Sequence, residues 1–431
     1  MTRVGFAGMT HLGLVSAVAT AAKGFAVVGY DADSSLVAAL SAGRLPVFEP
    51  QLDDLVRDHG DRLNFTADVA ALADCDVVYV APDIPTDDEG RSDVSAIRAL
   101  IDRVAPVLKP DAVMVVLSQV EPGFTRALPA PEPTRRYYQV ETLVFGRAVE
   151  RALQPERFIV GCADPAAPLP PAFASVLGAF GCPVLPMRYE SAELAKIAIN
   201  CCLVSSVSVA NTLAELCEAI GADWAEIVPA LKLDKRIGPH AYLKPGLGIA
   251  GGNLERDLAT VERIAAAHGA DAGVVSAWKA NSRHRRDWAL QTIRRVVLDA
   301  HPRATLAVWG LAYKENTRSI KNSPSLATLA QLPEDVTLRL HDPMVEAGVV
   351  ARASAQGFAQ PLDALDGANA LMILTPWPEY TRVSPRDIAA RLAGRVVLDP
   401  YAVLDGNAVT AAGLTYYTLG RGVNEPRRGG A

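Results

Sequence analysis

Short apolar runs alternate with amphipathic stretches along the first part of the chain. Apolar runs of about four to eight residues, separated by helical patterns, predict strands buried on both faces of a parallel sheet with right-handed crossovers. The pattern therefore predicts a doubly wound α/β domain. The runs that we interpret as strands are Arg3–Ala7, Ala26–Tyr30, Val77–Val80, Val113–Leu117 and Phe158–Val160.

The pattern changes after Arg188, where strand signals vanish and long helical patterns dominate, and it changes back beyond Pro302. A length of 431 residues fits about three units of roughly 150 residues each. We therefore predict two Rossmann-like α/β domains with doubly wound parallel sheets, joined by a central all-helical region. The repeated pattern is compatible with a distant duplication. The predicted domains are 1–188, 189–298 and 299–431, and the later strands are Thr305–Trp309, Thr337–Leu340, Ala370–Leu374 and Arg395–Leu398.

The composition is typical of a soluble enzyme, with 50% hydrophobic and 21% charged residues. A net charge of −6 gives no general reason to bind nucleic acid or an anionic membrane. The start of the chain lacks a signal-peptide pattern, and we find no apolar run of the ~18 residues that a membrane span needs. We expect a cytoplasmic protein without nucleic-acid or membrane partners.

The 6 cysteines are scattered without Cys-x-x-Cys spacing and lie mostly in apolar surroundings. Such cysteines are typical of buried, reduced thiols. We therefore expect no metal site and no disulfide framework.

A glycine-containing turn follows the first predicted strand and opens an Ala/Val-rich helix. Asp31 ends the next strand, at about the 20-residue spacing that dinucleotide sites use for the ribose hydroxyls, and it favours NAD over NADP. Thr10 replaces the usual middle glycine and places a Cβ where backbone and phosphate normally approach closely. A plain strand–helix turn is the alternative interpretation. The turn reads Gly8-Met9-Thr10-His11-Leu12-Gly13.

Further blocks follow in a fixed order along the chain. They include Leu45-Pro-Val-Phe-Glu-Pro-Gln-Leu, Ala192-Glu-Leu-Ala-Lys-Ile-Ala-Ile-Asn200, Gly310-Leu-Ala-Tyr-Lys314 and Thr375-Pro-Trp-Pro-Glu379. Together with the glycine turn, these blocks resemble the UDP-glucose/GDP-mannose dehydrogenase family of NAD-dependent nucleotide-sugar oxidoreductases. The resemblance implies NAD as cofactor, a nucleotide sugar as substrate, and a homodimer formed through the central helix. It also implies an NAD-binding first domain and a nucleotide-sugar-binding last domain.

The resemblance assigns binding residues position by position. For the cofactor they are Gly8, Thr10, His11, Leu12, Gly13, Asp31, Pro85, Ser118 and Lys314. For the substrate they are Glu141, Arg236, Tyr242, Leu243, Gly246, Gly248, Lys314 and Tyr401. Tyr401 stands where the family has a ligand-holding arginine, which leaves open a substrate other than UDP-glucose.

Part of the family's catalytic set is retained. Lys196 and Asn200 match a lysine and an asparagine that face the reacting carbon, and their spacing of one helical turn puts both on one helix face. An ammonium and an amide there stabilise negative charge on the oxygen as hydride leaves, and the lysine takes part in proton transfer. Asp257 matches the family's aspartate, which orients a water or the lysine. A solvated lysine and a packing asparagine are the alternative.

Other catalytic positions depart from the family. Asn253 replaces the nucleophilic cysteine, Gln119 replaces a water-binding threonine, and Phe145 replaces the acidic residue used in hydrolysis. Oxidation of an alcohol to an acid needs a thiolate to add to the aldehyde before the second hydride leaves, and asparagine is no nucleophile at neutral pH. A single hydride transfer remains chemically possible.

We therefore predict an NAD-dependent oxidoreductase that carries out one two-electron step on a nucleotide sugar. A redox-neutral epimerase with tightly bound NAD is one alternative. A nucleotide-binding pseudoenzyme is another. A four-electron dehydrogenase would require a cysteine of the central helix to act as the nucleophile.

Overall fold

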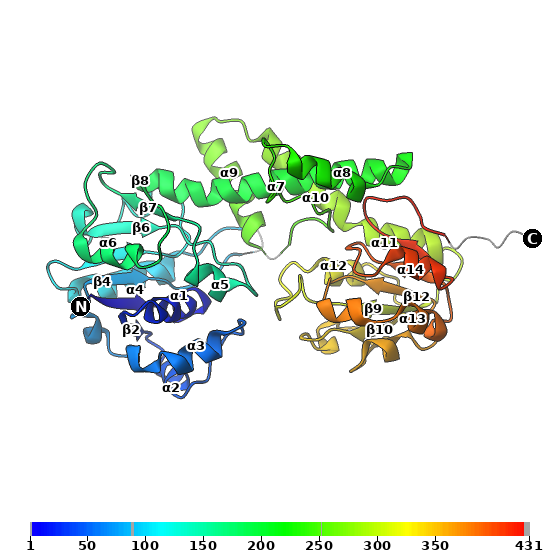
Figure 1. Cartoon of the computed structure of the whole chain (residues 1–431), viewed down its shortest axis with the longest axis horizontal. Coiled ribbons are helices and arrows are strands. Elements are labelled where there is room, and N and C mark those ends of the chain that lie inside the picture. The colour runs from blue at the N-terminus through cyan, green and yellow to red at the C-terminus, as the bar shows by residue number, and fades with distance from the viewer. Residues whose placement is uncertain (1, 88–89, 251, 426–431) are drawn as a thin grey trace, which may run out of the picture. The chain divides into compact units, whose positions relative to one another are not determined.

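The computed structural model describes residues 2–87, 90–250 and 252–425. The chain divides into two compact units, residues 1–199 and 200–431, and the division falls within the long helix α7 (Tyr189–Ile220), drawn in green in Figure 1. Each unit is described by itself. The domain boundaries predicted from the sequence stay a prediction.

The first unit is built on an eight-stranded sheet with the strand order β3-β2-β1-β4-β5-β6-β7-β8. All neighbouring strands are parallel except β6 and β7, which run antiparallel, so the sheet is mixed at this edge rather than wholly parallel as expected. The predicted strands are present, and β3, β6 and β8 are additional. The strands are β1 (Arg3–Ala7), β2 (Ala26–Tyr30), β3 (Leu63–Thr66), β4 (Val77–Val80), β5 (Val113–Val116), β6 (Arg136–Gln139), β7 (Phe158–Cys162) and β8 (Val184–Arg188).

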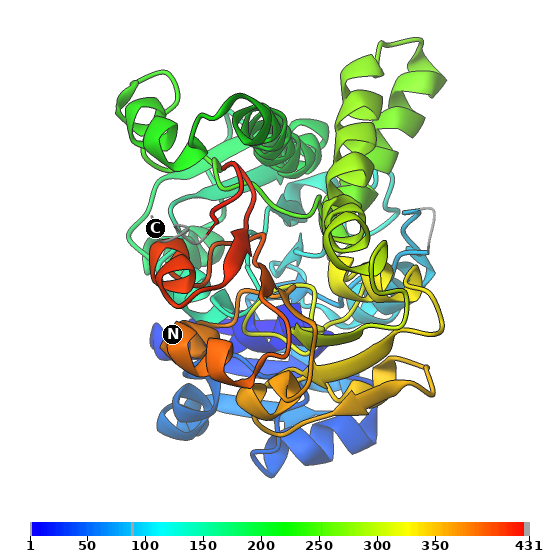
Figure 2. The same ribbon diagram turned by 90° about the vertical axis from the view of Figure 1, so that its right-hand side faces the viewer.

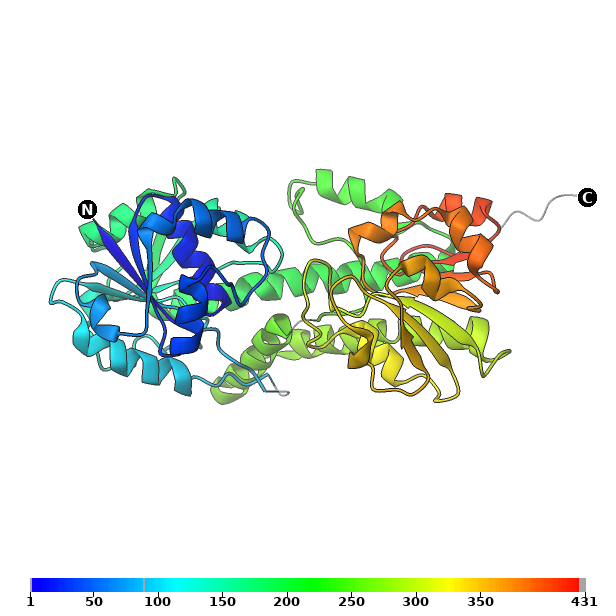
Figure 3. The same ribbon diagram turned by 90° about the horizontal axis from the view of Figure 1, so that it is seen from below.

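Helices cover both faces of this sheet (Figure 3). Successive strand residues point to opposite faces: Val77 and Tyr79 pack in a core with α1, whereas Val78 and Val80 pack in a second core with α4. Burial on both faces explains why these strands read as continuous apolar runs. The helices of this unit are α1 (His11–Ala22), α2 (Ser34–Ser41), α3 (Leu52–Asp58), α4 (Ser95–Val104), α5 (Ala148–Leu153) and α6 (Pro171–Gly178).

The second unit contains helices and a six-stranded parallel sheet with the order β11-β10-β9-β12-β13-β14. Its helices α9 and α10 lie side by side (Figure 2). The helices are α8 (Trp224–Leu233), α9 (Asn253–His268), α10 (Gly273–Arg286), α11 (Trp288–Ile293), α12 (Pro324–Ala330), α13 (Pro385–Arg391) and α14 (Gly406–Ala411). The strands are β9 (Thr305–Trp309), β10 (Thr337–His341), β11 (Ala355–Gly357), β12 (Ala370–Ile373), β13 (Val396–Leu398) and β14 (Thr415–Tyr417).

The second sheet repeats the strand order of β3 to β6 in the first sheet. In both sheets the central strand, β1 or β9, is followed by a glycine with positive φ, +93° at Gly8 and +99° at Gly310. In both, an aspartate follows the next strand and accepts backbone N–H groups from that glycine turn: Asp31 accepts from Met9, and Asp342 accepts from Leu311. Two doubly wound domains with a helical region between them confirm the predicted fold class.

One expectation about apolar runs is wrong. Helix α7 contains an 18-residue window with mean hydropathy 1.6, long and apolar enough to cross a membrane by composition. About 33% of that window is buried within the structure. Single polar residues, among them Asn200, interrupt the apolar run in the sequence, while the mean hydropathy of the window stays high. One such helix is weak support for a membrane span, because central helices of soluble proteins pass the same test.

Candidate active site

The glycine turn of the first unit has the geometry of a dinucleotide site. A Cβ on Gly8 would lie 2.8 Å from the backbone nitrogen of Pro82, and one on Gly13 would lie 1.8 Å from the Gly8 carbonyl oxygen. Both positions therefore require glycine, which brings α1 close to β1. Asp31 accepts the Met9 N–H at 2.8 Å through Oδ2 and the Asp33 N–H at 3.0 Å through Oδ1, which leaves lone pairs on its carboxylate for a ribose hydroxyl.

Two hydrogen bonds connect the start of α1, at Thr10 and His11, to Asp83, which follows β4. The Asp83 N–H donates to the Thr10 hydroxyl oxygen at 2.8 Å, and the His11 N–H donates to the Asp83 carboxylate at 3.0 Å. Thr10 itself makes no side-chain cap on α1. Asp83 thus caps the first turn of α1 from another segment.

Buried Glu49 connects His11 to the segment around Gly146 by hydrogen bonds. Its carboxylate bonds to the His11 ring at 2.8 Å and accepts the N–H groups of Gly146 and Ala148 at 3.0 and 3.1 Å. Burial opposes the charge on Glu49, but these bonds outweigh it and lower the pKa of the carboxyl. Phe145 stacks on His11 with ring centroids 4.4 Å apart. Phe145, which replaces an acidic residue of the family that the sequence resembles, therefore places an aromatic ring next to the His11–Glu49 pair.

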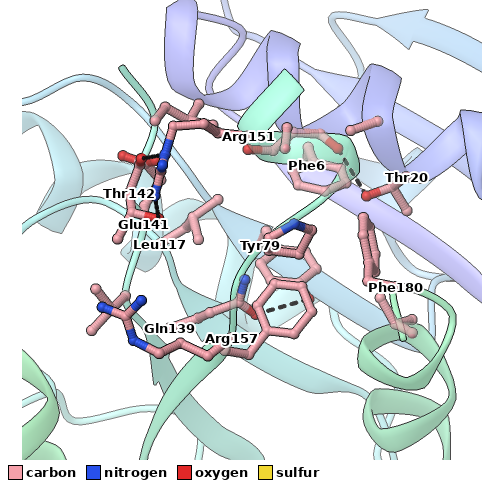
Figure 4. A pocket seen from close by; sticks show the side chains of 18 residues that line it. Phe6, Thr20, Tyr79, Leu117, Gln139, Glu141, Thr142, Arg151, Arg157 and Phe180 are labelled. Atoms are coloured by element: carbon pink, nitrogen blue, oxygen red, sulfur yellow. Dashed lines mark hydrogen bonds between the residues drawn. The ribbon is translucent and has the colours of Figure 1, made fainter. Parts of the chain in front are cut away.

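Glu141 lines a small cavity of about 60 Å³ in the first unit (Figure 4). The residue is partly exposed, but its Oε1 is enclosed and accepts no hydrogen bond from the described residues. Neighbouring Arg151 donates to the carbonyl and hydroxyl oxygens of Thr142. Burial raises the pKa of Glu141 to about 7, against the opposing positive charge of Lys196. A carboxyl with this pKa can exchange a proton at neutral pH.

The remaining cofactor positions of the first unit differ in exposure. Leu12 is buried, and so is Ser118, whose hydroxyl donates to the Pro82 carbonyl. Pro85 is exposed. Gln119, which was predicted as a catalytic position, is half-buried beside Ser118. Pro82, Ser118 and Gly8 therefore share one tightly packed corner at the carboxyl ends of β1, β4 and β5, the switch point where doubly wound sheets bind nucleotides.

Helix α7 carries Lys196 and Asn200 one turn apart. In the second unit the Asn200 amide donates to Asp257 at 2.5 Å, and Arg256 donates to the other carboxylate oxygen of Asp257 at 3.3 Å. All three residues of this group are buried. The predicted pair of Asn200 and Asp257 is thus in direct contact, and Asp257 holds the amide in a fixed orientation.

Asn253 is the first residue of α9 and its side chain is exposed. The preceding Gly252 has φ +89°, and the loop is held by Ser282, whose hydroxyl accepts the Ile249 N–H at 2.9 Å. A side chain at the first turn of a helix faces unpaired N–H groups and the positive end of the helix dipole. The loop therefore keeps the environment that lowers a cysteine pKa, although the residue there is an amide.

Cys201, on the central helix α7, is half-buried. It packs with Leu254 against the core between α7, α9 and α10. Burial raises the pKa of the Cys201 thiol, and the negative charge of Asp257 raises it further. A thiol in this state is a poor nucleophile at neutral pH. Among the described residues no group of three or more His, Cys, Asp or Glu side chains is arranged to hold a metal.

Three predicted substrate residues line one cavity of about 680 Å³ in the second unit: Tyr242, Leu243 and Tyr401. The cavity wall combines aromatic rings with the cationic side chains of Lys232 and Lys244. Aromatic and cationic groups of this kind suit a base and phosphates. The Trp224 indole donates to the Leu243 carbonyl at 2.7 Å and fixes this wall.

The glycine-rich loop packs next to this cavity. Asn211 on α7 accepts the Gly246 N–H at 2.9 Å, and a Cβ on Gly246 would lie 3.6 Å from the Tyr401 ring. Gly248 has φ +75°, and a Cβ there would lie 2.5 Å from the Ser282 carbonyl oxygen. Tyr401, at the position of the family's ligand-holding arginine, therefore packs against the glycine-rich loop at Gly246.

Two predicted substrate-binding cations, Arg236 and Lys314, lie elsewhere in the second unit. The Arg236 guanidinium is 89% exposed and bonds to Asp234. The Lys314 ammonium lies 5.6 Å from the Tyr313 ring centroid. Neither residue lines the cavity beside Tyr401.

The chain matches the models of the UDP-glucose/GDP-mannose dehydrogenase family along most of its length. The family's NAD-binding domain matches residues 2–168, its central domain 190–283, and its UDP-binding domain 307–406. The chain belongs to this family.

Relatives of this dehydrogenase family member cover nearly the whole chain. UDP-glucose 6-dehydrogenase of Pseudomonas aeruginosa is 30% identical over 98% of this chain and 97% of its own length, and UDP-glucose 6-dehydrogenase TuaD of Bacillus subtilis is 28% identical over 98% and 94%. A UDP-glucose dehydrogenase structure from Pyrobaculum islandicum has a TM-score of 0.82 at 28% identity, covering 95% of this chain and 98% of that one. The UDP-D-ManNAc dehydrogenase of Pyrococcus horikoshii, at 22% identity and a TM-score of 0.83, covers 98% of this chain and 100% of that one and shares the fold.

Family membership makes this dehydrogenase an NAD-dependent oxidoreductase of the nucleotide-sugar type that acts on a CH–OH group. The residues of the first unit fit NAD at the glycine turn and at Asp31, whose carboxylate has capacity for a ribose. Sequence reasoning missed Asp83 and Glu49 as parts of the site. Thr10 in place of the usual glycine was the available signal for Asp83, because the Thr10 hydroxyl accepts the Asp83 N–H. No residue spacing in the sequence indicates a role for Glu49.

Proposed function

We propose that this dehydrogenase carries out one reversible two-electron oxidation of a nucleotide-sugar alcohol and releases an aldehyde or ketone. The observation that carries the proposal is Asn253 at the start of α9, in the place of the family's nucleophilic cysteine. Cys201 supports it, because its thiol is packed in a core and has a raised pKa. The UDP-binding domain match and the cavity beside Tyr401 support a nucleotide-diphosphate sugar as substrate.

NAD, which the glycine turn and Asp31 would hold, would supply the hydride acceptor for the carbon that bears the hydroxyl. The hydroxyl proton passes to the chain, and Glu141 and Lys196 are the groups we assign to receive it. Asn200, oriented by Asp257, donates its remaining N–H to the substrate oxygen as negative charge develops there. The reaction stops at the carbonyl because an asparagine amide forms no adduct that could give up a second hydride.

The test is mass spectrometry of the products after incubation with NAD and a panel of UDP-, GDP- and dTDP-sugars, with NADH absorbance recorded in parallel. One NADH per carbonyl product supports the proposal. A carboxylate with two NADH contradicts it. An epimer without net NADH would replace it by the redox-neutral reaction, and no product with any panel member would favour a nucleotide-binding pseudoenzyme.

The pH dependence of the reaction should follow Glu141. Because its pKa is about 7, the carboxyl is protonated below neutral pH and cannot accept the substrate proton. We expect kcat/KM to rise as pH increases through about 7. Glu141→Gln should abolish this rise and lower kcat on the order of 10²-fold at pH 8. Steady-state rates between pH 5.5 and 9 check this.

The same residue makes a separate prediction for stability. A carboxyl whose folded pKa lies above its ordinary value of 4.5 stabilises the fold at low pH, and that contribution is lost as pH rises from about 4.5 to 7. Thermal melts of Glu141→Gln should lack this pH-dependent component. An unchanged pH profile of both activity and melting would show that Glu141 does not titrate in this range.

We propose a homodimer through α7. Four apolar side chains of α7 are exposed at helical spacing on one face: Val209, Leu213, Leu216 and Ile220. An apolar stripe with this spacing is typical of a helix–helix interface. We further propose a cytoplasmic location, where the free thiols of all six cysteines stay reduced.

Charges on this face should separate the dimer. We expect Leu213→Glu combined with Leu216→Glu to give a monomer in sedimentation equilibrium, because two buried carboxylates would cost several kcal/mol. Val274→Glu, which adds a charge at an exposed apolar position of α10, is the matched control and should stay dimeric. A double variant that sediments like the parent protein would rule out this face.

A further inference from the structure

We propose that Asp83 occupies the pyrophosphate position of the NAD site and has to leave it when the cofactor binds. The family assignment supplies NAD as the cofactor. The proposal rests on that assignment and not on the number of hydride transfers. It makes Asp83 and Thr10 residues that set cofactor affinity in this chain.

The geometry places the Asp83 carboxylate at the N-terminus of α1. The His11 N–H, in the first turn, donates to Asp83 Oδ2 at 3.0 Å. The Asp83 N–H donates in return to the Thr10 hydroxyl oxygen at 2.8 Å. Pro82, the residue before Asp83, packs so closely on the turn that a Cβ on Gly8 would meet its backbone nitrogen. The segment is therefore seated directly on the glycine turn.

The N-terminus of such a helix is where a dinucleotide places its pyrophosphate, because free N–H groups and the helix dipole favour an anion there. A carboxylate satisfies the same donors. Two anions cannot share them without strong repulsion at a few ångströms. Asp83 and the pyrophosphate therefore compete for one position.

The contacts of Asp83 allow it to leave. The residue is exposed, and among the described residues its carboxylate makes no hydrogen bond other than that with His11. The Thr10 hydroxyl holds the segment in place, and this contact would not exist with the usual middle glycine. Thr10, in place of the usual glycine, and Asp83 therefore act together: the Thr10 hydroxyl holds the segment whose carboxylate occupies the N-terminus of α1.

The charge of Asp83 also acts on Glu141. The negative charge of Asp83 contributes to the raised pKa of Glu141. Neutralising or moving Asp83 should therefore lower that pKa. The charges that act on Glu141 from the surrounding elements are Lys196, His11, Asp83 and Arg151.

The experiment measures ligand binding to the cofactor-free protein by isothermal titration, without turnover. Asp83→Asn keeps an oxygen acceptor for the His11 N–H and removes the charge. We expect its dissociation constants for NAD and for ADP-ribose to fall on the order of tenfold. Adenosine, which has no phosphate, should bind both proteins equally. The difference between the two proteins should shrink at high salt.

Asp87→Asn is the matched control, because it removes the same charge from the same loop. The Asp87 carboxylate bonds to Arg91 at 2.7 Å instead of to α1. We expect this variant to bind NAD like the parent protein. A second readout is the pH profile of activity, whose rise near pH 7 should move to lower pH in Asp83→Asn alone.

Unchanged or weaker NAD binding by Asp83→Asn would overturn the proposal, since it would show that Asp83 does not compete with the cofactor. Equal tightening of adenosine would also overturn it, because the effect would then be one of general loop structure. If Asp83→Asn does not fold, Thr10→Val tests the same idea, because it removes the hydroxyl that holds the segment and keeps the Cβ, and it should tighten NAD binding as well.

Discussion

Asn253→Cys should turn a one-step oxidoreductase into a two-step one that stalls on its own product. The new thiol would lie in the first turn of α9, exposed, where the helix dipole and free N–H groups lower a thiol pKa. It would add to the aldehyde and allow a second hydride to leave. We expect a single burst of about two NADH per subunit and a covalent acyl adduct in the intact-protein mass.

We expect the acyl adduct to persist because two other positions also differ from the family. Gln119 and Phe145 stand where the family has the residues that handle water, and Phe145 presents an aromatic ring stacked on His11. Adding Phe145→Glu to Asn253→Cys should restore slow release of the acid. Asn253→Ser, whose hydroxyl is a far weaker acid and nucleophile than a thiol, is the matched control and should give the aldehyde or ketone alone. If Asn253→Cys makes no adduct, its side chain does not reach the reacting carbon.

Lys196→Ala should lower kcat on the order of 10³-fold while NAD binding stays within about twofold of the parent protein. The reason is that the ammonium acts on charge that develops in the transition state, so its loss affects the rate more than binding. Lys196 is half-buried on α7, one turn before Asn200. Single-turnover rates with saturating NAD measure the effect on the chemical step.

Two further variants sharpen this test. Lys196→Arg keeps the charge but releases a proton much less readily, and it should recover part of the loss. Lys235→Ala removes an exposed lysine of the second unit and should leave kcat unchanged. A kcat for Lys196→Ala close to that of the parent protein would show that the lysine is a solvated surface group.

The strands that the sequence predicts are those buried on both faces. Val77–Val80 and Thr305–Trp309 are continuous apolar runs because helices cover both sides of the sheet. Strand β6 was missed because it contains Arg136, which is buried but hydrogen-bonded to backbone carbonyls. Strand β8 contains Pro186 and lies at a sheet edge, where proline is tolerated. Neither has the apolar pattern on which the prediction depends.

The site was predictable where one short segment carries it. The glycine turn with Asp31, and Lys196 with Asn200, each follow from local spacing. The roles of Glu49 and Asp83 depend on contacts between distant segments, such as that from Glu49 to Gly146, and no local pattern encodes such a contact. The assignments of individual site residues remain predictions that the variants above test.

The two aspartates after β2 and β10 have unequal spare capacity for a ligand. Asp342 accepts the N–H groups of Leu311, Ala312, Met344 and Val345 and the Trp377 indole, which saturates a carboxylate with about four acceptor sites. A ribose hydroxyl would have to displace the protein's own backbone there. Among the described residues, Asp31 accepts only two N–H groups and keeps acceptor sites open for a ligand, whereas Asp342 is fully used as a link between the second glycine turn and the segment after β10. Whether the aspartate at this place in either sheet can bind a ligand therefore depends on how many N–H groups of the protein already donate to its carboxylate.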